Sequence, residues 1–390
     1  MLNEKVKNYD VVVVGGGTAG IAAAAASART GVKTALIESS YLLGGLATSG
    51  MVTFYLPLCD GMGNQLCHGI SEELLKLSIS HGAEGPLPEV WLRPATREER
   101  DGKRYTVQYN PYVFAIEAER LLAKEGVDIL YGGTLAKAYT SERGDRIEKI
   151  EVVTRTETLY YSAKSFIDCT GDATLCELSG EKTALPAHGN VLAAWYYEVR
   201  NGEYRIRQKG SGDLVYSTMQ GDENAFDGLD SVKISEVMRE AHGVMLDDFL
   251  SHGDGDRKHA MATVCTIPQV RMTRRLCGVF EMKKTDDKKR FENSVGAFGS
   301  WREYGLAYEL PIDSLYGAKV KNLTVAGRLV SVENDDMWDI TRVIPVCAVT
   351  GEAAGVIAAM YDDTDKIEVK KVQNELISRG VKLHLSDCIL

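Results

Sequence analysis

Several features that would narrow the function are missing from this 390-residue sequence. Its eight cysteines are scattered and contain no C-x-x-C pair. We therefore expect neither a vicinal dithiol for disulfide reduction nor the cysteine set of a metal site or an iron–sulfur cluster. Thiols dispersed in this way are typical of a reduced protein, and they predict a cytoplasmic location.

Long apolar runs and an excess of basic residues are also lacking. The most apolar stretch, Ile21–Ala28, is too short to cross a bilayer, and the charged residues before Val11 do not resemble a secretory leader. Lys and Arg number 45 against 55 Asp and Glu, a net charge of −10. This acidity argues against nucleic acid as a partner. A small-molecule substrate is the partner we expect, with a homo-oligomer left open.

The sequence does contain a complete dinucleotide-binding unit near its start. An apolar strand, Tyr9–Val14, runs into a G-x-G-x-x-G motif that opens an alanine-rich helix over about 19–30, and a second strand ends at Glu38. The motif consists of Gly15, Gly16, Gly17, Thr18, Ala19 and Gly20. Its glycines permit a tight turn, approach of the backbone to a pyrophosphate and close helix–strand packing. Glu38 would accept hydrogen bonds from a ribose and repel a 2′-phosphate, which disfavours NADP.

Segments after Glu38 favour FAD over NAD. The glycine-rich stretch Gly44–Gly50 can lie against a flat ring system. A strand over 129–134 is followed by a predicted three-stranded antiparallel meander (135–140, 147–155 and 158–164). A further strand, 165–168, runs into Thr170-Gly171-Asp172. The end of a strand in a doubly wound sheet is where ligands bind.

A third segment near the C-terminus completes this pattern. The segment Leu323–Arg328 is predicted to be a buried strand followed by a glycine turn, and Arg342 is predicted to open a helix rich in small residues. Reduced flavin carries negative charge at its N1–C2 edge, which a helix N-terminus beside an arginine would stabilise. An arginine in the first turn of a helix is unfavourable without a partner anion, and this favours a functional role for Arg342.

In this order, the segments resemble the FAD-dependent oxidoreductase family of the glutathione-reductase-related superfamily. The resemblance implies an α/β fold, in which a Rossmann-type FAD-binding domain has a three-stranded β-meander crossover and an inserted α+β substrate cap. It places the FAD-binding domain at residues 1–185 plus 310–362, the cap at 186–309 and a C-terminal helical extension at 363–390. Within the cap, strands near 191–199 and 263–268, a helix over 235–250 and a loop over 210–230 are predicted.

The resemblance also implies which residues hold FAD. Glu38 would bind the adenosine ribose, the Leu135 backbone would border the adenine, and the pyrimidine edge of the flavin would face Arg342. The predicted cofactor-binding residues are Gly15, Gly17, Thr18, Ala19, Gly20, Glu38, Ser39, Gly44, Gly45, Leu46, Ala47, Thr48, Leu135, Thr170, Gly171, Asp172, Gly327, Arg328, Arg342, Val343 and Ile344.

Four residues are candidates for the chemistry: His68, Arg271, Arg275 and Arg342. Arg271 and Arg275 belong to the pattern P-x-x-R-x-x-R-R, which begins at Pro268, and either would clamp a carboxylate or form salt bridges across the cap interface. His68 follows the glycine-rich stretch and would be an acid or base near the flavin, or a surface histidine. No metal ligands are predicted.

The function predicted from these features is two-electron (hydride) transfer between FAD and a small polar substrate. No second G-x-G-x-x-G follows a strand, so a separate NAD(P) domain is not expected. Two alternatives remain open at this point. One is a flavin electron-transfer subunit of a larger complex, and the other is a non-redox enzyme related to thiazole-forming proteins.

Overall fold

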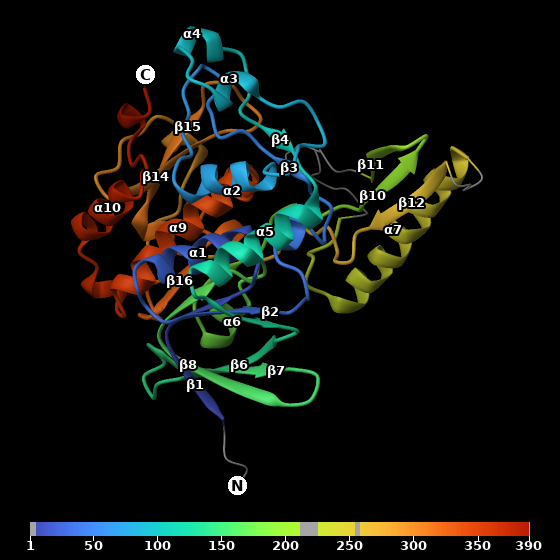
Figure 1. Ribbon diagram of the computed structural model, residues 1–390. Helices are drawn as coiled ribbons and strands as arrows, with labels where there is room; N and C mark the ends of the chain where they lie inside the picture. Colours follow the sequence, from blue (N-terminus) through green and yellow to red (C-terminus); the bar gives the residue numbers. More distant parts are fainter. Residues whose placement is uncertain (1–4, 211–224, 254–257, 390) are drawn as a thin grey trace.

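A computed structural model describes residues 5–210, 225–253 and 258–389 (Figure 1). The largest sheet within these ranges has seven strands, in the order β5-β2-β1-β8-β7-β6, with β16 also paired to β8. The parallel strands are β1 (Val6–Val14), β2 (Thr34–Glu38), β5 (Asp128–Tyr131), β8 (Thr158–Asp168) and β16 (Leu323–Val325); the antiparallel ones are β6 (Thr134–Thr140) and β7 (Ile147–Val153). The predicted α/β fold with a β-meander crossover is confirmed.

Strand β8 is one continuous strand, whereas the sequence predicted two with a break after Lys164. Its first residues, Thr158–Tyr161, pair antiparallel with β7, and its last, Phe166–Asp168, lie between β1 and β16. Along one edge of β8 the neighbouring strand changes from β7 to β16, while β1 lies along the other edge of both parts. The strand keeps its direction, and Lys164-Ser165 contains no turn-forming glycine or proline. The prediction of two strands was therefore wrong.

Two helices rich in small residues pack together on one face of this sheet: α1 (Thr18–Arg29) and α9 (Ile344–Met360) (Figure 1). A Cβ added at Gly351 would lie 2.3 Å from the Ala19 carbonyl oxygen, and one at Gly355 would lie 2.4 Å from that of Ala23. The Ser27 hydroxyl donates to the Gly355 carbonyl at 3.0 Å. The absence of a side chain at Gly351 and Gly355 is what permits this close approach of the two backbones.

A separate layer projects from the main body at the right of Figure 1. It consists of the strands β11 (Glu203–Gly210), β10 (Ala193–Arg200) and β12 (His259–Val264), in that order, and the helix α7 (Ser231–Ser251). The predicted strand at 191–199 and helix at 235–250 correspond to β10 and α7. The strand predicted at 263–268 lies earlier, as β12. The predicted loop falls mainly on 211–224, outside the described residues.

Other parts of the predicted cap pack on the main body. The strand β14 (Ser294–Gly299) lies against α9 and α10 (Val369–Ser378), and β15 (Ala307–Pro311) pairs with β14. The proposed domain boundaries therefore stay a prediction. Helix α10 corresponds to the helical extension, and it ends at Arg379-Gly380, where Gly380 has φ +86°.

The shorter elements connect these layers. They are β3 (Phe54–Tyr55), α2 (Ile70–Ser78), α3 (Glu89–Leu92), α4 (Arg97–Arg100), β4 (Val107–Gln108), α5 (Pro111–Lys124), α6 (Thr174–Ser179), β9 (Thr183–Ala184), β13 (Arg275–Leu276) and α8 (Asp335–Thr341). Across the described residues no single helix is long and apolar enough to cross a membrane. Helices α8 and α9 pass that test only as a pair bent by 81°, and most of α9 is buried in the core.

Candidate cofactor and substrate site

The three motif glycines have different surroundings. A Cβ at Gly15 would lie 2.3 Å from the Cys169 carbonyl oxygen, and one at Gly20 would lie 1.8 Å from the Gly15 carbonyl oxygen. These two glycines therefore serve the packing of the turn on β8 and α1. A Cβ at Gly17 would meet no described atom within 4 Å. The motif thus presents open backbone at Gly17, at the N-terminus of α1.

Glu38 organises the loop that carries this motif. Its carboxylate accepts hydrogen bonds from Gly16 N at 2.7 Å and Ser40 N at 2.6 Å, and it receives a longer one from the Ser39 hydroxyl at 3.3 Å. Oε1 accepts the two bonds from Ser39 and Ser40, whereas Oε2 accepts only that from Gly16 N and keeps a further lone pair. The geometry therefore leaves Glu38 able to accept a ribose hydroxyl while it fixes the glycine turn.

The structure brings the glycine-rich stretch directly beside the motif. Gly44 N donates to the Gly16 carbonyl at 2.8 Å, and Gly44 forms a bridge with Gly17. A short 3-10 helix, Gly45–Ala47, follows, and the Thr48 hydroxyl closes the loop on the Leu43 carbonyl at 2.6 Å. Just beyond it, Met51 is buried at φ +60°, a conformation that is unfavourable for a non-glycine residue and concentrates at functional sites.

The end of β8 is organised by a buried aspartate. Asp168 accepts hydrogen bonds from Thr170 N at 3.0 Å, the Thr170 hydroxyl at 2.7 Å and Cys176 N at 2.9 Å. Burial raises the pKa of Asp168, and these hydrogen bonds oppose that shift. Asp168 therefore holds in place the turn through Gly171, which has φ +82°.

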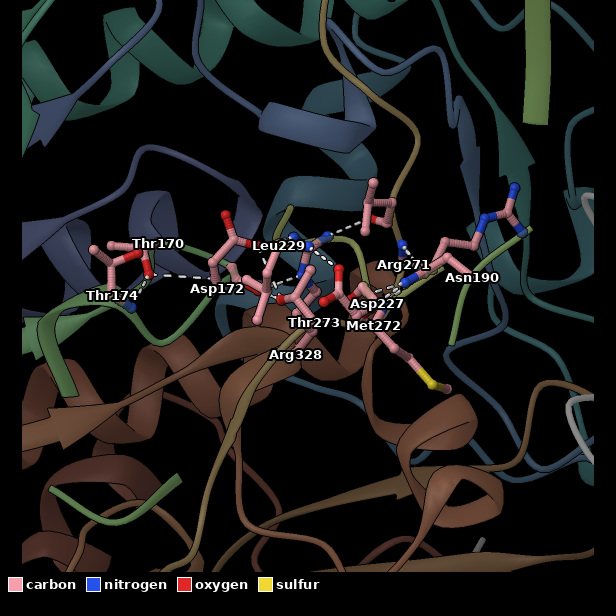
Figure 2. A network of polar contacts seen from close by, with 12 residues as sticks. Thr170, Asp172, Thr174, Asn190, Asp227, Leu229, Arg271, Met272, Thr273 and Arg328 are labelled. Atoms are coloured by element: carbon pink, nitrogen blue, oxygen red, sulfur yellow. Dashed lines mark hydrogen bonds and ion pairs between the residues drawn. The ribbon is translucent and has the colours of Figure 1, made fainter. Parts of the chain in front are cut away.

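Arg328 clamps this turn to the segment that follows β12 and leads out of the projecting layer (Figure 2). Its Nε donates to the Gly171 carbonyl at 2.5 Å, its Nη2 pairs with Asp172 at 2.8 Å and its Nη1 donates to the Val270 carbonyl at 2.6 Å. The Thr273 hydroxyl also reaches Asp172, at 2.9 Å. Since protein groups engage three of its nitrogens, the side chain of Arg328 holds the turn in position, and direct contact with a cofactor would compete with these bonds.

Arg342 does not open the helix that it was predicted to open. Helix α9 begins at Ile344 with Val343 as its N-cap, and Arg342 is the C-cap of α8. Its guanidinium pairs with the carboxylate of Asp339, which also accepts a hydrogen bond from Arg302 at 2.5 Å. A cation at a helix C-terminus beside an anion is favourable. The expectation of an uncompensated arginine in a first helical turn was therefore wrong.

Helix α9 still lies beside the turn after β16, where a Cβ at Gly327 would lie 3.8 Å from the sulfur of Cys347 in its first turn. Gly327 N donates to the Thr350 hydroxyl on α9 at 2.9 Å, and a Cβ at Gly327 would lie 2.9 Å from that of Ala19 on α1. The turns after β1, β8 and β16 therefore meet at the carboxyl edge of the parallel strands. Leu135 lies farther along the sheet, at the start of β6, and its pair in the register is Val152 of β7.

The three remaining catalytic candidates have separate surroundings. The guanidinium of Arg271 lies 5.0 Å from the centre of the Trp195 ring, whereas Arg275 is buried over Trp338 and donates to the Glu333 carbonyl at 2.9 Å. His68 Nε2 lies 3.1 Å from the Gln65 carbonyl oxygen. Burial lowers the pKa of His68, and its charged neighbours belong to α2 and to Lys382. These contacts point His68 toward α2 and the C-terminal segment.

Sequence reasoning missed two buried amides that hold the projecting layer in place. Gln269 donates to the Gly50 carbonyl at 2.5 Å and accepts from Trp195 N at 3.1 Å. Asn190 accepts from both Arg271 N and Met272 N at 2.9 Å. Each of these amides joins segments that are far apart in the sequence, so neither partner can be read from the neighbouring residues. The only local sign of such a role was an amide side chain beside apolar residues. Within 5–210, 225–253 and 258–389, no group of three or more His, Cys, Asp or Glu side chains could hold a metal ion.

Comparison with known proteins gives matches over most of the chain. The family model described as "FAD dependent oxidoreductase" matches residues 10–194 and 190–376. The chain is 30% identical over 176 residues to a tRNA uridine 5-carboxymethylaminomethyl modification enzyme of Fusobacterium nucleatum, covering 42% of this chain and 26% of that one. It is 27% identical over 192 residues to a thiamine thiazole synthase of Metallosphaera sedula, covering 47% and 61%. The chain thus spans about a quarter of the tRNA-modifying relatives.

A solved structure shares the fold over nearly the whole chain. A geranylgeranyl bacteriochlorophyll reductase-like protein from Thermoplasma acidophilum superposes with a TM-score of 0.52 at 15% identity. The superposition covers 98% of this chain and 86% of that one. At this identity the likeness concerns the arrangement of the elements.

Proposed function

Because the chain belongs to the FAD dependent oxidoreductase family, we propose that it transfers two electrons, as hydride, between flavin and a small polar substrate. FAD is its cofactor, and this group supplies reversible two-electron chemistry when bound. The protein then has to bind the cofactor, orient the substrate and exclude water. All eight cysteines are free, which supports the proposed cytoplasmic location.

The residues at the carboxyl edge of the sheet suit each part of FAD. In this proposal, Gly15–Gly20 and the N-terminus of α1 hold the pyrophosphate, and Glu38 holds the adenosine ribose. The turn through Thr170–Asp172 and the backbone at Gly327 hold the ribityl chain. The flavin ring lies against Gly44–Thr48, and its pyrimidine edge meets the backbone at Val343 and Ile344, where α9 begins. Arg342 contributes positive charge there, moderated by Asp339.

The observation that carries this assignment is the open space at Gly17. Protein atoms fill the position that a side chain would take at Gly20, but no atom of the described residues fills that position at Gly17. Gly17 also lacks the positive φ that favours glycine elsewhere in this loop. The packing of the protein does not account for a glycine at this position, whereas close approach of a pyrophosphate does.

This assignment predicts a specific effect of Gly17→Ala. The protein should fold with unchanged stability in the absence of cofactor, because the added methyl group meets no atom of the residues that the structure describes. Its affinity for FAD should fall by about tenfold or more, which corresponds to roughly 1.4 kcal/mol. Titration of apoprotein with FAD, together with thermal unfolding of the apoprotein, measures both effects.

Gly20→Ala is the matched control for this experiment. Its methyl group would lie 1.8 Å from the Gly15 carbonyl oxygen, so the apoprotein itself should lose stability. Unchanged FAD affinity in Gly17→Ala would contradict the placement of the pyrophosphate. A wild-type protein that takes up no FAD would contradict the proposed function as a whole.

Two alternative functions predict different behaviour of the holoenzyme. An electron-transfer subunit would reduce a protein acceptor without turnover of a small substrate. The match to thiamine thiazole synthase favours a non-redox reaction, but it covers only 47% of this chain. Anaerobic bleaching of the flavin by hydroxy acids, sugars or amines supports the proposed reaction, and its absence with all of them supports the alternatives.

A further inference from the structure

The face of β10 that lies toward the glycine loop carries a buried donor. Trp195 is 5% exposed and packs edge-on against Phe54, 6.5 Å between ring centres. Its indole Nε1 is buried and has no hydrogen-bond partner among the described residues. A buried N–H group without an acceptor destabilises the folded protein. Such a group in a native structure calls for an explanation, and an acceptor that binds from outside the protein supplies one.

A cation lies on the same ring. The guanidinium of Arg271 is 5.0 Å from the centre of the Trp195 ring, and its side chain extends away from the polar network that its backbone joins (Figure 2). The indole nitrogen belongs to the ring that the guanidinium covers. The two donors are therefore neighbours, although they come from β10 and from the segment after β12.

Both donors are fixed to the proposed flavin loop by backbone contacts. Gln269 accepts from Trp195 N and donates to the Gly50 carbonyl, and Thr266 N donates to the Ser49 carbonyl at 2.9 Å. Asn190 holds the backbone of Arg271 and Met272. The pair is thus placed beside the Gly44–Gly50 loop by buried amides rather than by its own flexible side chains.

We propose that Trp195 and Arg271 bind a carboxylate group of the substrate, so that the enzyme acts on a small carboxylic acid. This inference rests on the proposed function, because it assigns the substrate class of the same site. Indole and guanidinium groups donate hydrogen bonds and accept none, so their ligand supplies acceptors only. A carboxylate has two such oxygens and the opposite charge to Arg271, and its plane matches that of a guanidinium.

The test uses the FAD-loaded enzyme and pairs of small probes. Propionate and benzoate are titrated while the visible flavin spectrum is recorded, and propionamide and benzamide serve as neutral partners of the same shape. The acids should perturb the spectrum with saturation, and the amides should bind at least about tenfold more weakly. Equal binding of acid and amide, or no response to either, overturns the inference.

Variants assign the effect to the two side chains. Arg271→Gln should weaken propionate binding by at least about tenfold and leave propionamide unchanged, and Trp195→Phe should weaken it several-fold. Arg274→Gln and Trp91→Phe are matched controls, because Arg274 pairs with Glu177 and Trp91 donates to the Lys103 carbonyl. Carboxylate binding that is unchanged in both test variants overturns the inference.

The outcomes also separate this inference from the function on which it rests. Each variant is first checked for its content of FAD and for the unperturbed flavin spectrum, which shows that it has folded. Loaded enzyme that is reduced by a neutral substrate but ignores carboxylates contradicts only the substrate class. Protein that takes up no FAD contradicts the proposed function.

Discussion

At the scale of single residues, Glu352 is a carboxylate buried beneath the N-terminus of α2. It accepts a hydrogen bond from Ile70 N at 2.8 Å, and a Cβ at Gly69 would lie 2.3 Å from the same oxygen. Burial raises the pKa of Glu352 from 4.5 to about 7, while Arg379 and Arg29 oppose the shift. The protonated acid is therefore the form that the folded protein prefers.

This raised pKa makes the stability of the protein depend on pH. The contribution of Glu352 is fully present below its unfolded value of 4.5 and is lost as the pH rises through about 7. Glu352→Gln keeps an acceptor for Ile70 N and cannot ionise. Between about pH 5 and pH 8, the variant should gain up to roughly 3 kcal/mol relative to the wild type. Urea unfolding at several pH values measures this difference.

The control for this prediction is Glu368→Gln. Glu368 is an exposed carboxylate that pairs with Lys371 on the surface, so its neutralisation should leave the pH profile unchanged. Parallel pH profiles for the wild type and Glu352→Gln would show that Glu352 ionises as freely in the folded protein as in the unfolded chain.

At the scale of elements, the contact of α1 with α9 depends on the missing side chain at Gly355. A methyl group there would lie 2.4 Å from the Ala23 carbonyl oxygen, and both backbones belong to rigid helices. Gly355→Ala should therefore destabilise the protein by roughly 1–3 kcal/mol, although alanine has the higher helix propensity. The midpoint and slope of urea unfolding measure the change.

Gly243→Ala in α7 isolates the effect of packing from that of propensity. A Cβ at Gly243 meets no described atom within 4 Å, so this variant should be stabilised by up to about 1 kcal/mol. If both substitutions stabilise the protein equally, the two helices are free to move apart and their close approach is not required.

The elements also show what the sequence could predict. The unit from β1 to β2 follows from local patterns, since apolar strands, glycines and an alanine-rich helix occur in order. Helix α8 was missed although its signals were present: Asn334 caps Met337 N, and Asp335 and Asp336 lie in the first turn. Arg342 was consequently assigned to α9, and its partner Asp339 on α8 was not anticipated.

The candidate site was less predictable than the fold because its contacts join residues that lie far apart in the sequence. Which glycines pack against protein and which leave open space depends on neighbours such as Cys169, more than 150 positions from Gly15. Gln269 meets Gly50 across 219 positions and Trp195 across 74. Hydrogen bonds of this kind leave no periodic pattern in a sequence, so the pair formed by Trp195 and Arg271 emerges only from the folded chain.

At the scale of the whole molecule, the proposed cofactor site is assembled from distant parts of the chain. Its turns follow β1, β8 and β16, whose last residues are Val14, Asp168 and Val325. The projecting layer of β10, β11, β12 and α7 is inserted between the second and third of these turns (Figure 1). The site is therefore complete only when both ends of the chain have met on the same sheet edge.

The pairing of α1 with α9 has a consequence for how the protein is made. Ser27 and Gly355 are 328 positions apart, so a ribosome adding about 5–20 residues per second needs roughly 16–66 s to supply the partner of α1. Throughout that interval the alanine face of α1 is exposed in the nascent chain. We expect ribosome-bound chains stalled before residue 344 to be digested by protease at α1, and the folded chain that contains α9 to resist it. Equal resistance of both would show that another part of the nascent chain packs on α1 during synthesis.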